Sequence, residues 1–175
     1  MTAGVLVDSN VLLDVLTEDA AWSTWSAAAL QAAADVGPLV INPIIYAEVS
    51  VRFSRIEDLE EALPADAVHR QEVPWAAAFL AGKAFVEYRR RGGTRRSPLP
   101  DFFIGAHAAV GGLRLLTRDP HKEVNEAFFR RQIRQSVQRR NRLFGPPESW
   151  QQTNAFRLVF SEADGLSGLI ADQYA

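Results

Sequence analysis

Short apolar runs alternate with longer stretches of helical periodicity along the first two thirds of the chain. The apolar runs at residues 5–7, 39–41 and 113–117 are too short for helices, and polar residues follow them closely. The stretches between them predict helices over residues 11–16, 21–34, 43–53, 56–63, 75–91 and 100–110. Short strands that alternate with helices predict an α/β fold, with a parallel sheet flanked by helices.

Proline, glycine and small polar residues mark the ends of these elements. Ser9 or Asn10 is expected to cap the helix at residues 11–16. The stretch between Pro64 and Pro74 is interpreted as a loop or a short strand. Residues 94–98 are polar, basic and end in proline, so we expect an exposed loop there.

Four carboxylates stand close to the ends of the predicted strands. Asp8 ends the first strand, and Glu48 lies in the helix after the second. Asp101 begins the helix before the third strand, and Asp119 follows that strand within two residues. In a right-handed parallel sheet these positions converge on the carboxyl edge. Oxygen ligands without His or Cys suit Mg²⁺ or Mn²⁺, and such a site supports phosphodiester hydrolysis by metal-activated water.

Each of these carboxylates also has an ordinary structural interpretation. An aspartate after a strand, or in the first turn of a helix, is a common capping residue. Four of them at successive strand ends favour a shared site over four separate caps. Asp14 is expected on a helix face, paired with an arginine. His107 lies six residues after Asp101, off its helical face, so we expect a core or surface histidine rather than a ligand.

Composition narrows the class of protein. The 175 residues include no cysteine, which excludes a disulfide framework, thiolate zinc sites and cysteine nucleophiles. Hydrophobic residues make up 47% and charged residues 23%, so the chain is not disordered throughout. We find no apolar stretch of the ~20 residues that a membrane span needs and no basic leader, and we expect a cytoplasmic protein.

The charge is distributed unevenly. The first 120 residues carry 11 basic and 15 acidic side chains, whereas the remainder carries 8 and 6. A basic cluster precedes Asp101 and consists of Arg89, Arg90, Arg91, Arg95 and Arg96. Cations at a helix C-terminus are favoured by the helix dipole, which is one interpretation of the cluster. Its place beside Asp101 favours the other, a contact with the phosphates of a nucleic-acid substrate, which is RNA if the resemblance described next holds.

Four segments together resemble the motifs of a known family. Residues 5–14 (VLVDSNVLLD) resemble the opening motif of PIN-domain ribonucleases, and residues 43–49 (PIIYAEV) resemble the second. Residues 99–108 (LPDFFIGAHA) and 115–119 (LLTRD) resemble the third and fourth. The order and spacing are similar to those of VapC-type toxins, over residues 1 to about 120.

The resemblance implies a PIN-like fold and Mg²⁺-dependent endonucleolytic cleavage of RNA. It implies that Asp8 and Asp101 touch the first metal, and that Asp119 completes that site directly or through water. Glu48 would serve a second metal or orient the attacking water. The supporting residues implied at the site are Ser9, Asn10 and Thr117. As partners, the resemblance implies a cognate antitoxin of a VapBC-type pair and a second copy in a homodimer.

The last third of the chain has a different character. An arginine-rich helix is expected over residues 123–144, and two strands near residues 155–160 and 169–171 suggest a hairpin. Residues 122–131 and 153–172 resemble the linker region of SAM-dependent large-subunit rRNA methyltransferases. With no glycine-rich SAM loop and no catalytic cysteine, methyl transfer is not expected. We therefore expect a PIN-like nuclease domain at residues 1–120. We expect residues 121–175 to form an atypical extension in place of the final strand.

Two other functional hypotheses remain open at this stage. The chain could be a catalytically impaired PIN scaffold that only binds RNA or a partner. It could also be an RNA-binding or adaptor protein that works through the basic helix expected at residues 123–144.

Overall fold

The computed structural model of the chain describes residues 4–119, 131, 157–159 and 170–172. No helix among these residues has the length and apolar character to cross a membrane. The strands are β1 (Val5–Val7), β2 (Leu39–Ile41), β3 (Val68–Arg70), β4 (Arg114–Leu116), β5 (Arg157–Val159) and β6 (Ile170–Asp172). The helices are α1 (Ser9–Leu16), α2 (Ser23–Val36), α3 (Pro43–Ser50), α4 (Ile56–Ala62), α5 (Trp75–Arg90) and α6 (Pro100–Val110).

The first four strands form one parallel sheet in the order β3-β2-β1-β4. Val5 of the central strand β1 pairs with Leu39 on one side and with Arg114 on the other. The predicted α/β class with a parallel sheet is therefore confirmed. The stretch between the two prolines contains the short strand β3, so the second of the two interpretations holds there.

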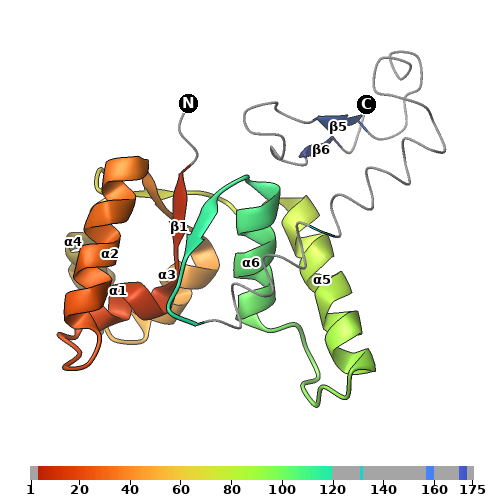
Figure 1. The fold of residues 1–175 in the computed structure, drawn as a ribbon, viewed down its shortest axis with the longest axis horizontal. Coiled ribbons are helices and arrows are strands. Elements are labelled where there is room, and N and C mark those ends of the chain that lie inside the picture. Colours follow the sequence, from red (N-terminus) through yellow and green to blue (C-terminus); the bar gives the residue numbers. More distant parts are fainter. Residues whose placement is uncertain (1–3, 120–130, 132–156, 160–169, 173–175) are drawn as a thin grey trace.

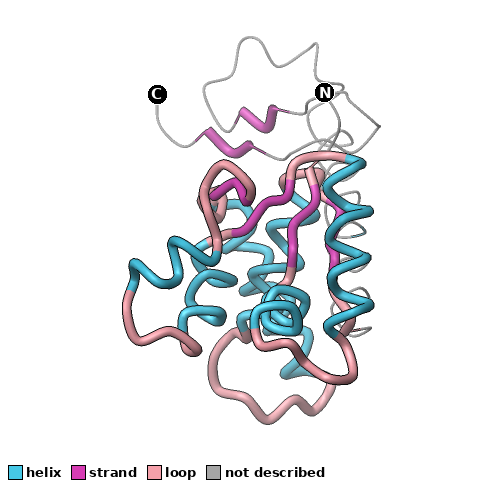
Figure 2. The backbone as a smooth tube through the Cα atoms, turned by 90° about the vertical axis from the view of Figure 1, so that its left-hand side faces the viewer, coloured by secondary structure: helices cyan, strands magenta, loops and turns pink. Residues whose placement is uncertain are grey.

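Helices cover both sides of the sheet. In Figure 1, α1, α2 and α4 lie to one side of β1, α3 overlaps β1 in this view, and α6 and α5 lie to the other side. Figure 2 shows the strands running between these helices, with the loop after α5 projecting from the end of the molecule. Crossover helices bury both faces of a parallel sheet, which explains why the two central strands, β1 and β2, are continuous apolar runs without alternation.

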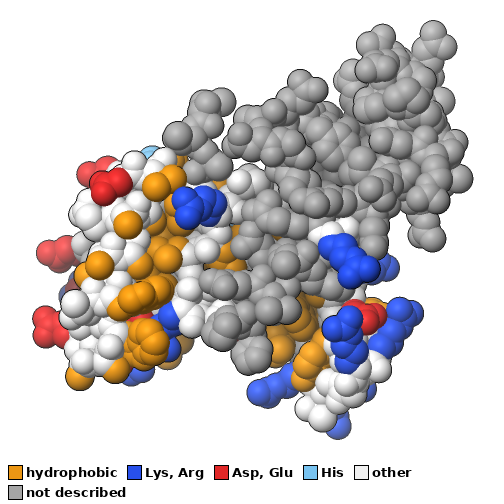
Figure 3. All heavy atoms as spheres, viewed as in Figure 1, with side chains coloured by type: hydrophobic (Ala, Val, Ile, Leu, Met, Phe, Trp, Pro, Cys, Tyr) orange, Lys and Arg blue, Asp and Glu red, His pale blue; other side chains and the backbone are white. Residues whose placement is uncertain are grey.

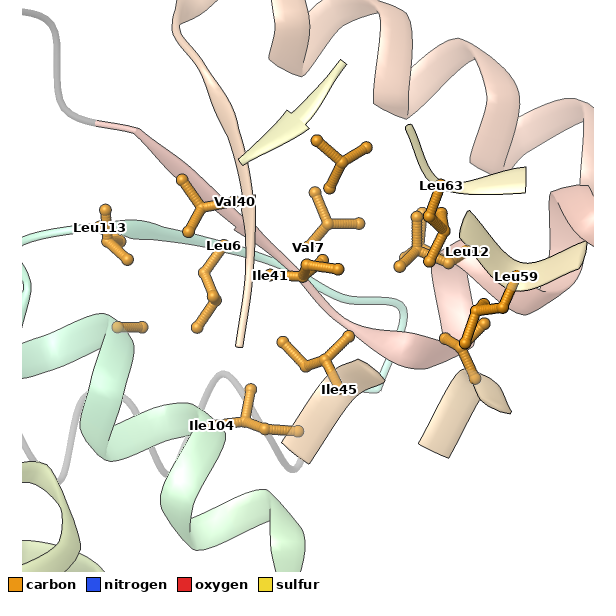
Figure 4. Close-up of a cluster of buried hydrophobic side chains, with 14 residues drawn as sticks. Leu6, Val7, Leu12, Val40, Ile41, Ile45, Leu59, Leu63, Ile104 and Leu113 are labelled. Carbon is orange, nitrogen blue, oxygen red and sulfur yellow. The ribbon is translucent and has the colours of Figure 1, made fainter. Parts of the chain in front are cut away.

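The core lies between the sheet and the helices on its two faces. Leu6, Ile41, Ile45 and Ile104 are at most 1% exposed and come from two strands and two helices (Figure 4). A second apolar cluster joins α5 to α6, where small residues such as Ala77 bring the helices close together. Together these contacts fix α3 and α6, which carry two of the four carboxylates, against β1.

The C-terminal part is described only at its two strands. β5 and β6 pair with each other in antiparallel register, as the expected hairpin requires. They form a two-stranded sheet of their own, and in the described part of the chain β4 has β1 as its strand neighbour. The helix expected at residues 123–144 lies outside the described residues, apart from residue 131.

Candidate functional site at the carboxyl edge of the sheet

Asp8 stands where β1 ends and α1 begins. Its side chain is fully buried and accepts a hydrogen bond from the backbone N–H of Ser9 at 2.8 Å, so Asp8 is the N-cap of α1. The expectation that Ser9 or Asn10 caps this helix is wrong, because the carboxylate one residue earlier already satisfies a free N–H at the helix start. The cap holds the Asp8 side chain at the carboxyl edge of the sheet.

Ser9 connects Asp8 to Glu48. The Ser9 hydroxyl donates to Glu48 Oε2 at 2.6 Å, and its oxygen lies 3.5 Å from Asp8 Oδ1. Since a hydroxyl has one proton, the shorter contact to Glu48 is the hydrogen bond. Glu48 is partly buried on α3. The contact thus brings together two carboxylates that are forty positions apart in the sequence.

Thr117 makes the corresponding connection from the end of β4. Its hydroxyl donates to Asp8 Oδ2 at 2.7 Å and accepts from the Asn10 side-chain amide at 3.1 Å. The same oxygen accepts from the backbone N–H of Asp119 at 3.0 Å. Thr117 therefore fixes the backbone of Asp119 relative to Asp8. Ser9, Asn10 and Thr117, the supporting residues of the sequence analysis, all lie in this network.

Asp101 lies in the first turn of α6 and is partly buried. The helix packs against α3, which carries Glu48. Within the described residues, however, no three His, Asp or Glu side chains are grouped so that they could hold a metal ion together. The oxygen donors fit Mg²⁺ or Mn²⁺ in their chemistry. The side-chain positions place Asp8 and Glu48 together, with the backbone of Asp119 beside them.

The basic cluster stands at the end of α5 and in the loop that leads to α6. Arg89 donates to the backbone oxygens of Gly93 and Arg95, so it holds the loop itself. Arg91 forms an ion pair with Glu87 at 2.9 Å. Arg95 and Arg96 are exposed in the loop. Figure 3 shows Lys and Arg side chains gathered at this end of the molecule.

His107 is a core residue, one of the two environments expected for it, and is 1% exposed. Its Nδ1 accepts from the side-chain amide of Asn42 at 3.1 Å, and burial lowers the pKa of the imidazole. The side-chain oxygen of Asn42 in turn caps α3 by accepting from the backbone N–H groups of Ile44 and Ile45. The sequence analysis missed this brace between α3 and α6. An asparagine just before a proline at a helix start was the available signal for its cap.

Comparison with known proteins gives the family. The family model of the PIN domain matches residues 5–126, and the chain belongs to the PIN domain family, a family of nucleases. Two VapBC structures resemble the fold. The VapBC2 complex of Rickettsia felis, bound to a DNA fragment from its promoter, has a TM-score of 0.52 and 16% identity, covering 66% of this chain and 87% of that chain. VapBC-1 of nontypeable Haemophilus influenzae has a TM-score of 0.54 and 17% identity, covering 70% and 92%.

A separate similarity concerns rRNA methyltransferases, as the sequence analysis predicts. Ribosomal RNA large subunit methyltransferase I of Alteromonas mediterranea is 37% identical over 62 residues, which are 35% of this chain and 15% of that protein. The chain spans 14–15% of the length of such curated relatives. The similarity is therefore limited to a small part of each methyltransferase.

Proposed function

We propose that the chain is a metal-dependent endoribonuclease and the toxin of a VapBC-type pair. The observation that carries the proposal is the Ser9 hydroxyl, 2.6 Å from Glu48 Oε2 and 3.5 Å from Asp8 Oδ1 at the carboxyl edge of the sheet. Membership of a nuclease family supports the reaction class, and the VapBC-like fold supports the biological role.

In this proposal the chain supplies oxygen ligands and orientation. Asp8 and Asp101 would hold a Mg²⁺ or Mn²⁺ ion, and Asp119 would complete the site directly or through water. The ion would lower the pKa of a bound water and stabilise charge on the phosphate. Glu48 holds a second ion or orients the attacking water. Ser9 donates to Glu48, and Thr117 donates to Asp8. These two hydrogen bonds fix the orientation of both carboxylates before a ligand binds.

The proposed partners follow from the same assignment. They are an RNA substrate, a cognate antitoxin and a second copy of the chain in a homodimer, acting in the cytoplasm. Trp22 and Trp25 are 41% and 44% exposed near the start of α2, and large exposed aromatic side chains of this kind favour a covering protein partner.

Chelation of metal is expected to stop cleavage of RNA by the full chain. EDTA should lower the rate by at least about 10²-fold, and excess Mg²⁺ or Mn²⁺ should restore it, because the proposed reaction depends on the cation to lower the pKa of the water and to offset charge on the phosphate. The measurement is the cleavage of a labelled RNA, resolved on a gel. An unchanged rate in EDTA would contradict the proposal.

A second candidate function is an RNA-binding scaffold without catalysis. The observation that favours it is that no three acidic or histidine side chains of the described residues are grouped to hold a metal. Such a scaffold would retain its RNA affinity in EDTA and after Asp8→Asn, with affinity falling steeply as salt increases. Cleavage that depends on both metal and Asp8 would exclude it.

Replacing Arg95 and Arg96 together with alanine is expected to weaken RNA binding. Both side chains are exposed in the loop before Asp101, and loss of two phosphate contacts should raise KM and reduce the salt slope of binding by about 2. The matched control replaces Arg55 and Lys83, which are also exposed. Filter binding at several salt concentrations measures the slope. Equal slopes for the two double variants would leave the loop without a role in RNA binding.

A further inference from the structure

Arg118 lies in the turn after β4, between Thr117 and Asp119, and it ties this turn to α1. Its Nε donates to Asp14 Oδ2 at 2.8 Å and its Nη2 donates to Asp14 Oδ1 at 3.2 Å. The Asp14 side chain is 4% exposed, whereas that of Arg118 is 33% exposed. A bidentate hydrogen bond to a buried carboxylate fixes the orientation of the guanidinium as well as its distance. The pairing of Asp14 with an arginine confirms the sequence prediction.

The same guanidinium also reaches α2. Ser26 donates to Asp14 Oδ2 at 2.8 Å, so the carboxylate receives three hydrogen bonds in all. The Cζ atom of Arg118 lies 5.1 Å from the ring centroid of Trp22, at the start of α2, within the range of a cation–π contact. Arg118 is thus held by both helices of the α1–α2 pair.

These contacts fix the backbone that leads into Asp119. The N–H of Arg118 lies 3.5 Å from the side-chain oxygen of Asn10, and the N–H of Asp119 donates to Thr117 at 3.0 Å. Thr117 is anchored to Asp8 on one side of the turn. On the other side the anchor is the contact between Arg118 and Asp14. Both contacts therefore connect the turn to α1, because Asp8 caps this helix and Asp14 lies on it.

We propose that Arg118 is a positioning residue for Asp119. It acts through the backbone of the turn and through Asp14, and it does not contact the substrate. The inference rests on the proposed function, since it assumes that Asp119 helps to hold the metal. A displacement of about 1 Å in a metal-binding carboxylate lowers the rate far more than it lowers fold stability, which gives the proposal a measurable signature.

The chain offers a matched control at the opposite edge of the sheet. Arg70 on β3 pairs with Glu60 at 2.6 Å, and its Cζ lies 5.2 Å from the ring centroid of Tyr46. Arg70 therefore has the same combination of an ion pair and an aromatic neighbour as Arg118, and it is the last residue of a different strand of the sheet. Its removal reports the general effect of losing such a contact.

The experiment compares Arg118→Ala with Arg70→Ala in the full chain. For Arg118→Ala we expect Mn²⁺ binding, measured by calorimetry with the metal alone, to weaken at least about tenfold, and RNA cleavage to fall about 10²-fold with KM unchanged. Arg118→Lys should recover only part of the loss, because an ammonium cannot bridge both oxygens of Asp14. Arg70→Ala should lower Tm without changing Mn²⁺ binding.

A further variant covers the case in which Arg118→Ala does not fold. The double variant Asp14→Asn with Arg118→Gln removes the buried charge together with its partner and keeps an oxygen that can accept from Ser26. It should fold and retain the defect in Mn²⁺ binding. Wild-type Mn²⁺ binding in this variant, or an equal defect in Arg70→Ala, would overturn the proposal.

Hydrogen exchange separates this proposal from the proposed function. If the wild-type chain neither binds Mn²⁺ nor cleaves RNA, the nuclease assignment fails, and the exchange rate of the Asp119 amide still reports the order of the turn. Faster exchange at Asp119 in Arg118→Ala, with no change in Arg70→Ala, would support the positioning role. An unchanged rate in both variants would overturn it.

Discussion

Replacing Asp8 with asparagine is expected to abolish RNA cleavage while leaving the fold intact. Asp8 is fully buried at the junction of β1 and α1 and receives hydrogen bonds from the Ser9 amide and the Thr117 hydroxyl. Asparagine is as good an N-cap as aspartate, so its oxygen can retain the bond from Ser9. It lacks the negative charge that a divalent cation requires, and we expect the rate to fall at least about 10³-fold.

The substitution separates the two interpretations of Asp8. If the residue is only a helix cap, Asp8→Asn should cleave RNA at nearly the wild-type rate. If it binds the metal, cleavage should be lost in a variant that still folds, with a lower Tm because the single side-chain oxygen of asparagine cannot accept from both Ser9 and Thr117. The matched control is Asp35→Asn, because Asp35 is an exposed aspartate on α2 whose carboxylate accepts from Gln31. Single-turnover cleavage and thermal unfolding by circular dichroism measure the two effects. A rate within tenfold of wild type would remove Asp8 from the proposed site.

The sequence predicted the sheet well because its strands are local signals. The apolar triplets at β1 and β2 are almost entirely buried, and the N-cap of a helix follows each of them directly. At β4 the local signal is weaker, because an exposed arginine precedes two partly buried leucines. β3 was the difficult strand. Its residues Val68–Arg70 have one buried and two exposed side chains, the pattern of an edge strand with little apolar signal.

The contacts within the site could not be derived from the sequence in the same way. The Ser9–Glu48 hydrogen bond spans 39 positions and the Thr117–Asp8 bond spans 109. Sheet topology predicts that such residues share an edge, and it does not predict which hydroxyl meets which carboxylate. For the same reason the sequence predicted four converging carboxylates, while the described residues contain no metal-holding group of three.

One ion pair of the basic cluster could have been predicted from the spacing of residues along a helix. Glu87 stands four residues before Arg91, the spacing of a helical ion pair, and the two side chains form that pair at 2.9 Å. Arg89 is occupied with the loop that follows α5. Charge counting alone treats the five arginines as equivalent. Arg90 also pairs with Glu87, at 3.9 Å. Arg95 and Arg96 are therefore the two arginines of the cluster that we select to test for RNA contact.

Mild acid is expected to destabilise the protein through His107. The side-chain oxygen of Asn42 caps α3, so the NH₂ group of the same side chain faces His107 Nδ1. Since that NH₂ group can only donate, Nδ1 must be an unprotonated acceptor. Protonation would set an N–H against that amide inside the core. Burial accordingly lowers the pKa of His107 from its ordinary value of 6.5. The native state therefore binds fewer protons at this group than the unfolded state does.

The sign and the pH window follow from this direction. The contribution of His107 to stability is fully present above pH 6.5, the unfolded value, and is lost as the pH falls toward the lowered pKa of the folded state. Within that window each pH unit lowers the free energy of unfolding by at most about 1.4 kcal/mol, the value for one full proton. Urea unfolding between pH 7.5 and 5 measures the slope.

Two variants assign the slope to this histidine. His107→Gln lacks a titrating group, and its side-chain oxygen can accept from the Asn42 amide, so this variant should be less dependent on pH between 6.5 and 5. His69→Gln is the matched control, because His69 is exposed on β3 and should keep the wild-type slope. Equal slopes in all three proteins would show that His107 is not the group that titrates. A flat profile in His107→Gln alone would establish that the brace between α3 and α6 depends on a neutral imidazole, and that acid weakens the support of the helix that carries Glu48.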